Sequence, residues 1–293
     1  MRVSEQAIFN LANQRIMRAR ADSLQAGDQV SSGKRVEHPW DDAGDAGLIV
    51  RHEQEAGRQS GVMLAATHAS DELNMVDGAL DQVTTSLTRI KELAVQLSND
   101  TYSANDRKGG AQEVSQLFGA VVSQLNVRLG ERYLFGGMQD TQPPFDASGN
   151  YLGDANVRQV EIAPGVLQDA SARADVALKG AGGGVDVLTA VQNFATALNA
   201  NDTINIRAAV QNLDDAIAQV SRERSRVGGM QNVFDVASTM AKQNRDLTND
   251  ARSKLEDVDI FEASTRLQST QRALEASMSA ASQQFKLTLL DKL

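Results

Sequence analysis

Hydrophobic residues recur every three or four positions over much of the chain, which is the spacing of one face of an α-helix. The clearest stretch alternates steps of three and four, the heptad pattern of coiled coils. A second helix at about 107–129 follows a short turn, which predicts an antiparallel helical hairpin. The residues predicted to form the core of a helical rod are Leu73, Val76, Leu80, Val83, Leu87, Ile90 and Leu97.

The stretch 257–293 contains no proline and no glycine, and apolar or small residues follow it at helical spacing. Nothing within the stretch covers this face, so the pattern predicts a helix that packs against the other end of the chain or against another molecule. A weaker, alanine-rich stripe predicts a first helix over 4–31 that is not stable alone. The residues predicted to form an assembly surface are Leu11, Ile16, Ile260, Leu267, Leu274, Met278, Phe285 and Leu289.

Between the helical arms the pattern changes to short β-like pieces separated by glycine and proline turn signals. We predict a small β-rich insert with strands at 157–162 and 175–178. Helical periodicity then returns in a short helix at 187–198 and in a long one over 203–256. At ~1.5 Å per residue the long helix would measure on the order of 80 Å, a length that suits a rod better than a globular core.

These patterns predict a mainly α fold, an elongated helical rod and coiled-coil bundle formed by N- and C-terminal arms, with a small β-rich insert. The expected domains are an N-terminal helix of a terminal coiled-coil domain at 1–40, the N-terminal arm of the rod at 41–137, the insert at 138–184, the C-terminal arm of the rod at 185–256 and the C-terminal coiled-coil helix at 257–293.

Composition narrows the class of protein further. Aromatic residues make up only 4% of the 293 residues, with Trp40 as the single tryptophan, so no aromatic-rich globular core is available. The net charge of −9 and the lack of a long basic run argue against a nucleic-acid partner, and Arg15, Arg18 and Arg20 are interpreted as a solvated helix face. No apolar run approaches the length of a membrane span, so we expect no membrane insertion.

The loop expected at 34–47 places carboxylates beside a histidine in the run HPWDDAGD at 38–45. Its spacing does not match the oxygen ligands of an EF-hand loop, so turn formation and helix capping are the favoured roles. The chain has three histidines and no cysteine, no nucleophile–base pattern joins them, and the glycines at 182–184 do not fit a phosphate-binding loop. We therefore expect no catalytic, cofactor or metal site, and no enzyme.

Several stretches resemble the signatures of the flagellin superfamily, in the order that the family shows. They cover both arms, at about 1–135 and 185–293. The matching segments are VSSGKRV at 30–36, DDAG at 41–44, DGAL at 77–80, RIKELAVQ at 89–96 and LEDVD at 255–259.

Within the family, YLFGG at 133–137, Thr141 and PPF at 143–145 resemble the members that join hook to filament. The residues TLLDKL at 288–293 do not follow the commonest ending of filament flagellins. The resemblance therefore favours a structural adaptor at the hook–filament junction. A filament flagellin is the alternative, and a cytoplasmic coiled-coil scaffold is a further one.

The resemblance implies that both termini pair as a coiled coil near the axis of a tube, with the helical rod around it and the insert projecting outward. It implies export unfolded through the flagellar type III apparatus, with a flagellar export chaperone holding the C-terminal helix. It also implies an extracellular ring of copies between the other hook-associated junction protein and the first flagellin subunits. A chain without cysteine is compatible with such export, because no crosslink can trap it.

Overall fold

The computed structural model describes residues 2–290, except for the side chains of residues 2–5, 8 and 284–290. The chain divides into two compact units. Unit 1 comprises Met1–Arg58 and Asn244–Leu293, and unit 2 comprises Gln59–Gln243. Unit 1 is therefore formed by the two ends of the chain, and unit 2 by its middle, which includes the insert.

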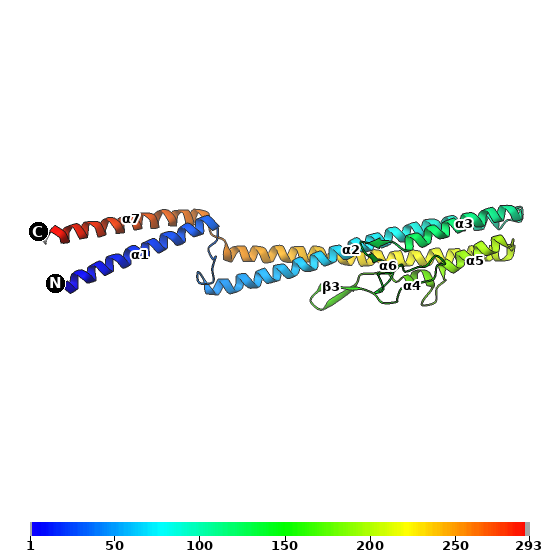
Figure 1. The fold of residues 1–293 in the computed structure, drawn as a ribbon, viewed down its shortest axis with the longest axis horizontal. Coiled ribbons are helices and arrows are strands. Elements are labelled where there is room, and N and C mark those ends of the chain that lie inside the picture. The colour runs from blue at the N-terminus through cyan, green and yellow to red at the C-terminus, as the bar shows by residue number, and fades with distance from the viewer. Residues whose placement is uncertain (1, 291–293) are drawn as a thin grey trace. The chain divides into compact units, whose positions relative to one another are not determined.

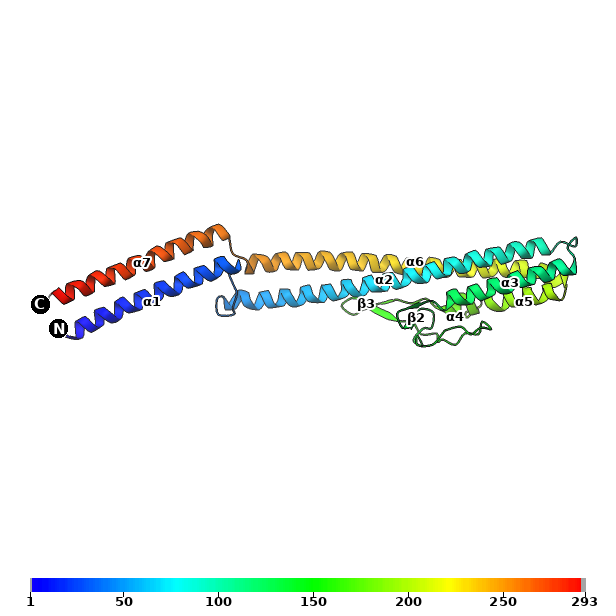
Figure 2. The ribbon, with the colours of Figure 1, turned by 45° about the horizontal axis from the view of Figure 1, so that its top comes forward.

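Unit 1 is built on two long helices, α1 (Arg2–Ser32) and α7 (Ile260–Leu290). They lie side by side and antiparallel, as Figures 1 and 2 show. The fully buried residues of these two helices are alanines, Ala26, Ala263 and Ala281, and Gly27 lies against the larger, partly buried Leu267. Such a contact buries little apolar area per residue, so it stabilises the pair only weakly.

Local hydrogen bonds set the helix boundaries of unit 1, and two of them differ from the prediction. The loop was expected to run to 47, but α2 (Ala43–Leu97) begins earlier because the Asp42 carboxylate accepts the backbone N–H groups of Gly44 and Asp45. The last helix begins at Ile260 rather than 257, because the Asp259 carboxylate caps its first turn.

Unit 2 contains the rest of α2 and α6 (Thr203–Glu256), together with α3 (Ala104–Leu125) and α5 (Val187–Asn199). One hydrophobic cluster runs through these helices. Ion pairs join their edges, from Arg224 of α6 to Asp77 of α2 at 2.9 Å and from Arg89 of α2 to Glu113 of α3 at 2.9 Å. The predicted bounds of the long helix, 203–256, agree with α6, which continues through Gly228 and Gly229.

Two antiparallel hairpins lie between α3 and α5. The first, β1 (Arg128–Leu129) with β2 (Arg132–Tyr133), precedes the expected insert of 138–184, and the second, β3 (Gln159–Ala163) with β4 (Val166–Asp169), lies within it and is followed by the short helix α4 (Ala174–Lys179). In the second hairpin Gln159 pairs with Asp169. The prediction of a strand at 157–162 overlaps β3.

Two predictions in this region are wrong. The strand expected at 175–178 is helix α4, whose buried Ala174, Ala177 and Leu178 follow helical spacing and which ends at Gly180 in the left-handed region, φ 71°. The helix expected to reach 129 stops at Leu125, because the Asn126 side chain bonds both backbone groups of Phe145 at 2.9 and 3.0 Å.

The segment between α3 and α5 shares the core of the helices of unit 2. Phe135 and Phe145 are fully buried in the same cluster as α2, α3, α5 and α6. Tyr151 packs beside Phe145, and its hydroxyl lies 3.0 Å from the carbonyl oxygen of Phe135 and 2.8 Å from that of Asp154. Burial, with the charges of Asp175 and Asp154, raises the pKa of Tyr151 to about 12.

Candidate assembly site

Two segments far apart in the sequence meet in unit 1, where the terminal helix pair connects to α2 and α6. The backbone N–H groups of Arg35 and Val36 donate to the carbonyl of Glu256, at 2.6 and 3.3 Å. In return the N–H of Val258 donates to the carbonyl of Gly33 at 3.0 Å. We call residues 33–36 and 255–258 the clasp; it brings together two of the sequence signatures, from 30–36 and 255–259.

The Arg35 side chain holds the clasp to both long helices. Its guanidinium donates to the carbonyl of Leu255 at 2.7 Å, and it pairs with Asp42 at 3.2 Å and with Asp45. Arg35 thus places positive charge at the C-terminal end of α6 and beside carboxylates in the first turn of α2, which both helix dipoles favour. The hydrogen bond to Asp45 raises the pKa of Arg35, and the Asp45 N–H and Arg35 lower the pKa of Asp42.

Two further side chains tie the clasp to α1 and α6. Lys34 pairs with Glu256 at 2.6 Å, and this hydrogen bond raises the pKa of Lys34. The Glu256 carboxylate also forms an ion pair with Arg252 at 3.2 Å. From the last turns of α1, the Gln29 amide donates to the carbonyl of Arg35 at 3.3 Å. The clasp therefore joins the segment after α1 to the end of α6 and the start of the segment before α7.

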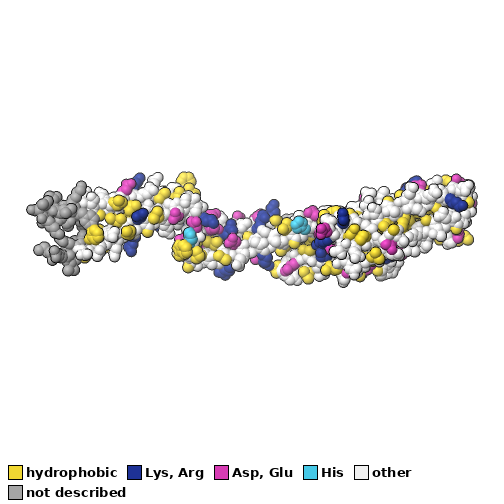
Figure 3. Space-filling model, viewed as in Figure 1, with side chains coloured by type: hydrophobic (Ala, Val, Ile, Leu, Met, Phe, Trp, Pro, Cys, Tyr) yellow, Lys and Arg dark blue, Asp and Glu magenta, His cyan; other side chains and the backbone are white. Residues whose placement is uncertain are grey.

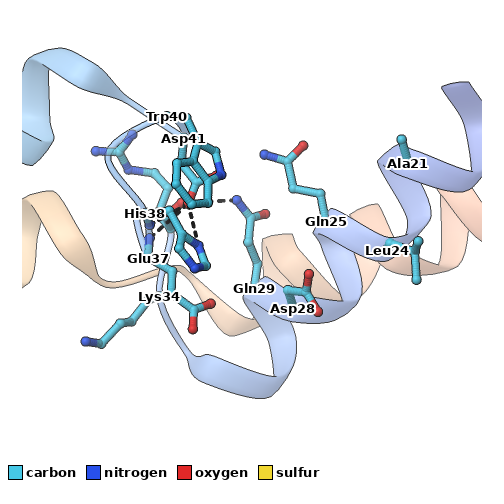
Figure 4. Close-up of a pocket in the computed structure, with 11 residues that line it drawn as sticks. Ala21, Leu24, Gln25, Asp28, Gln29, Lys34, Glu37, His38, Trp40 and Asp41 are labelled. Carbon is cyan, nitrogen blue, oxygen red and sulfur yellow. Dashed lines mark hydrogen bonds and ion pairs between the residues drawn. The ribbon is translucent and has the colours of Figure 1, made fainter.

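The loop after the clasp presents an exposed aromatic ring. The Asp41 carboxylate accepts the N–H groups of His38 and Glu37 at 2.8 and 3.1 Å, and the first of these bonds lowers the pKa of Asp41. Trp40 stacks on His38 with ring centroids 4.5 Å apart. These rings line an open groove of about 540 Å³. Figure 4 shows the side chains of Gln25 and Gln29 of α1 facing the rings, with Leu24 further along the helix.

The carboxylates of this loop accept hydrogen bonds from nearby backbone N–H groups. Asp41 and Asp42 both accept backbone N–H groups, as turn and capping residues do. Within residues 2–290 no three His, Cys, Asp or Glu side chains form a group that could hold a metal ion.

The residues predicted as an assembly surface divide into three groups. Leu11, Ile260 and Met278 are about half exposed, at 49%, 50% and 56%. A second group is partly buried and consists of Ile16, Leu267 and Leu274. The remaining two, Phe285 and Leu289, have side chains outside those that the structure describes.

The seven residues predicted as the rod core all lie in α2 within unit 2. Each of these side chains is at most 4% exposed, and all belong to the one hydrophobic cluster of that unit. They are Leu73, Val76, Leu80, Val83, Leu87, Ile90 and Leu97.

The hydrophobic pattern of the sequence does not identify the polar residues that join the helices and loops. Arg35 was part of a matching signature, which was the only available signal. Arg107, only 3% exposed, donates to the carbonyls of Leu97 and Asn99 at 3.0 Å each and binds Asn201 at 2.5 Å. Its position in the first turn of α3 gave no sign that it would be buried.

A helical fold in which the first and last helices pair, with a small insert between two helical arms, defines the class of protein. The model of the bacterial flagellin N-terminal helical region matches residues 3–140, and that of the C-terminal helical region matches residues 210–292. The chain belongs to the flagellin superfamily.

Two relatives illustrate the similarity within the family. The chain is 32% identical over 157 residues to flagellar hook-associated protein 3 of Escherichia coli strain K12, an alignment that covers 53% of this chain and 50% of that protein. It is 28% identical over 276 residues to the flagellin of Bacillus subtilis strain 168, covering 88% of each. The chain thus spans about half the length of the hook-associated relative that it matches.

A solved structure shows the same fold. A flagellar hook-associated protein from Vibrio parahaemolyticus superimposes with a TM-score of 0.68 at 21% identity, over 74% of this chain and 100% of that one. None of the helices within residues 2–290 is both long and apolar enough to cross a membrane.

Proposed function

We propose that the protein is a structural adaptor of the bacterial flagellum, forming the extracellular junction between hook and filament. The observation that carries the proposal is that the fully buried residues of α1 and α7 are alanines, while larger apolar side chains on both helices stay exposed. Figure 3 shows such hydrophobic side chains along the terminal pair. Exposed apolar residues in this number are typical of a surface that another molecule covers.

In the proposed assembly, copies of the chain form a ring in which the terminal pairs pack on one another. The ring contacts the other hook-associated junction protein on one side and the first flagellin subunits on the other. The similarity to hook-associated protein 3 supports this position of the ring in the flagellum. Before assembly, a flagellar export chaperone would hold the α7 segment, since its apolar side chains need cover in the unfolded chain too. The mechanism is packing, with no catalytic step.

A filament flagellin is the second candidate, because the alignment with flagellin covers 88% of both chains. Immunogold labelling of isolated flagella separates the two. The junction protein should label one point where hook meets filament, whereas a filament flagellin should label the whole filament.

The assembly role is tested with paired substitutions in a strain that lacks the native gene. Ile260→Asp with Met278→Asp places charges on the exposed side of α7, where they should leave the fold intact. The variant should be exported, yet cells should lack filaments and release flagellin into the medium. Val166→Asp with Leu167→Asp is the control, with 49% and 59% exposure in β4. Normal filaments on cells with the α7 variant would contradict the proposal.

A further inference from the structure

Three arginines of α1 lack a counter-charge in unit 1. Arg15, Arg18 and Arg20 are exposed, and none of them forms an ion pair with another side chain that the structure describes. Arg15 lines an open hollow of about 340 Å³ between α1 and α7, together with Leu11 of the predicted assembly surface. A guanidinium that enters a contact between molecules loses water and therefore needs a carboxylate as its partner.

Charge is divided unequally along the terminal helix pair. The start of α1 and the end of α7 lie together, away from the clasp (Figures 1 and 2). We call residues 2–20 and 272–290 the basic end, because they carry six basic and two acidic side chains. Residues 21–58 and 244–271, with eight basic and fourteen acidic side chains, are the acidic end. One chain thus carries two surfaces of opposite charge.

Two carboxylates of the acidic end are available to another molecule. Ion pairs within the chain already engage Asp42, Asp45 and Glu256. In contrast, Asp28 of α1 and Glu262 of α7 are exposed and form no ion pair within the described part of unit 1.

Asp28 also lines the open groove of about 540 Å³, close to the amides of Gln25 and Gln29 (Figure 4). Carboxylate and amide oxygens both accept hydrogen bonds from a guanidinium, which offers five N–H donors and no acceptor. This mostly polar groove therefore suits an arginine side chain.

The basic end cannot reach Glu262 within one chain. Gly27 of α1 lies against Leu267 of α7, and the two helices are antiparallel. Arg18 lies nine residues from Gly27 toward the basic end, and Glu262 lies five residues from Leu267 toward the clasp. These fourteen residues of helix, at ~1.5 Å each, separate the two side chains by roughly 20 Å. A partner for Glu262 must come from another molecule.

The charges also favour one arrangement of neighbouring copies. Two terminal pairs that point the same way at the same level would place basic end against basic end, and like charges repel. A displacement along the axis by roughly half the length of α1, about 23 Å at ~1.5 Å per residue, brings the basic end of one copy beside the acidic end of the next.

We propose that Arg15, Arg18 and Arg20 of one copy pair with Asp28 and Glu262 of a neighbouring copy displaced along the axis of the terminal pair. The contact joins two different surfaces, so it is heterologous, and its repetition closes a ring or continues as a helix. This inference rests on the proposed function, because it names the charges that set the displacement between copies in the junction.

Exchange of the charges tests the pairing in a strain that lacks the native gene. The readout is the fraction of exported protein that is found in isolated flagella. Arg15→Glu, Arg18→Glu and Arg20→Glu together should lower it at least about tenfold, since each charge then faces its own sign. Asp28→Arg with Glu262→Arg should do the same. All five substitutions in one chain restore opposite charges in exchanged places and should recover incorporation.

Lys108→Glu with Arg222→Glu is the control for altered net charge. Both side chains are exposed in unit 2, so this variant should enter flagella normally. Failure of the fivefold variant to recover, or normal incorporation of the two partial variants, overturns the pairing.

Crosslinking tests the displacement directly. The chain has no cysteine, so introduced cysteines are the only thiols. In intact flagella, Arg18→Cys with Glu262→Cys should give bands at multiples of the subunit mass with a short bis-maleimide that spans less than the distance between these positions in one chain. Arg18→Cys alone should give no dimer. A dimer from this single variant would show that basic ends lie together.

The outcomes separate the two proposals. A dimer from Arg18→Cys alone, or a crosslink from the double-cysteine variant only to flagellin or to the other hook-associated junction protein, overturns the charge pairing and leaves the junction role standing. Protein in the flagella without a crosslink between copies does the same. Absence of the unsubstituted protein from flagella overturns both.

Discussion

Arg35 shows how much one side chain contributes in this fold. Its planar guanidinium binds a helix-terminal carbonyl and two carboxylates at once, a geometry that the single ammonium group of lysine cannot reproduce. The side chain is 40% exposed, so solvent weakens each ion pair. Its effect should therefore be local, on the clasp, rather than on global stability.

We predict that Arg35→Gln opens the clasp without unfolding unit 2. Amide hydrogen exchange at Val36 and Val258 should accelerate by about tenfold, which corresponds to ~1.4 kcal/mol of local opening. Arg35→Lys should restore part of the protection, since lysine keeps the positive charge but lacks the planar guanidinium that binds several oxygens at once. Arg207→Gln, which breaks the exposed Arg207–Asp100 pair in unit 2, is the control and should leave both amides unchanged. Unaltered exchange in Arg35→Gln would mean that the backbone bonds hold the clasp alone.

Tyr151 gives a prediction at alkaline pH. Its pKa is raised from 10.0 to about 12 in the folded chain, so the folded state favours the neutral hydroxyl. The resulting stabilisation is complete below pH 10 and is lost as pH rises through 12. Tyr151→Phe should be less stable by ~1–3 kcal/mol at pH 7, because the carbonyls of Phe135 and Asp154 lose the one O–H that they share. Urea denaturation should show this difference shrinking between pH 10 and 12; a difference that grows would contradict the assignment.

At the scale of elements, two kinds of helix contact coexist. The seam of α2 buries leucine, isoleucine and valine side chains completely, whereas α1 and α7 bury alanines. Full burial of a leucine contributes ~1.5–3 kcal/mol, and an alanine contributes much less. The long helices of unit 2 thus provide a permanent core, and the terminal pair provides a contact that is easily separated.

Leu87 tests the α2 seam. Its side chain is fully buried, so Leu87→Ala should destabilise unit 2 by ~2–5 kcal/mol. Leu64→Ala is the matched control, a leucine of the same helix that is 56% exposed, and its cost should stay below ~0.5 kcal/mol. Thermal unfolding followed by circular dichroism measures the stability of both variants. Equal unfolding midpoints would contradict the placement of Leu87 in the core of unit 2.

At the scale of the whole molecule, the difference between the two units predicts an order of opening. Unit 2 holds the large buried side chains, including Phe135, Phe145, Phe194 and Phe234, and unit 1 holds none of comparable size among the residues described. We therefore expect the terminal pair to be less stable than unit 2, and packing against neighbouring molecules in the proposed junction would stabilise it.

Limited proteolysis of the dilute protein should reveal this order. We predict that a protease cleaves first within residues 1–58 and 244–293 and leaves a resistant fragment close to 59–243. Mass spectrometry over a time course identifies the fragment. Simultaneous cleavage of both units would show that the terminal pair is as stable as the core of unit 2.

Much of the helical architecture was predictable from the sequence, and the reason is local. The α2 seam and the bounds of α6 follow from hydrophobic spacing and from the absence of proline, which act over a few turns. The predictions of secondary structure were wrong where contacts with distant residues outweigh the local conformational preference of the sequence. Helix α3 ends at Leu125 because Asn126 bonds Phe145, and residues 175–178 form a helix because their buried side chains pack in the core of unit 2.

By itself, the sequence determined the helical arms, the presence of a small insert between them and the family, because periodicity and signature segments are properties of neighbouring residues. Only the tertiary structure decided that Arg35 reaches the carbonyl of Leu255, 220 positions away, and that Trp40 borders a groove. It also left the ring of Phe261 uncovered. The physical reason is that hydrogen-bond partners and exposure depend on which distant segments the fold brings together, and hydrophobic spacing carries no information about that pairing.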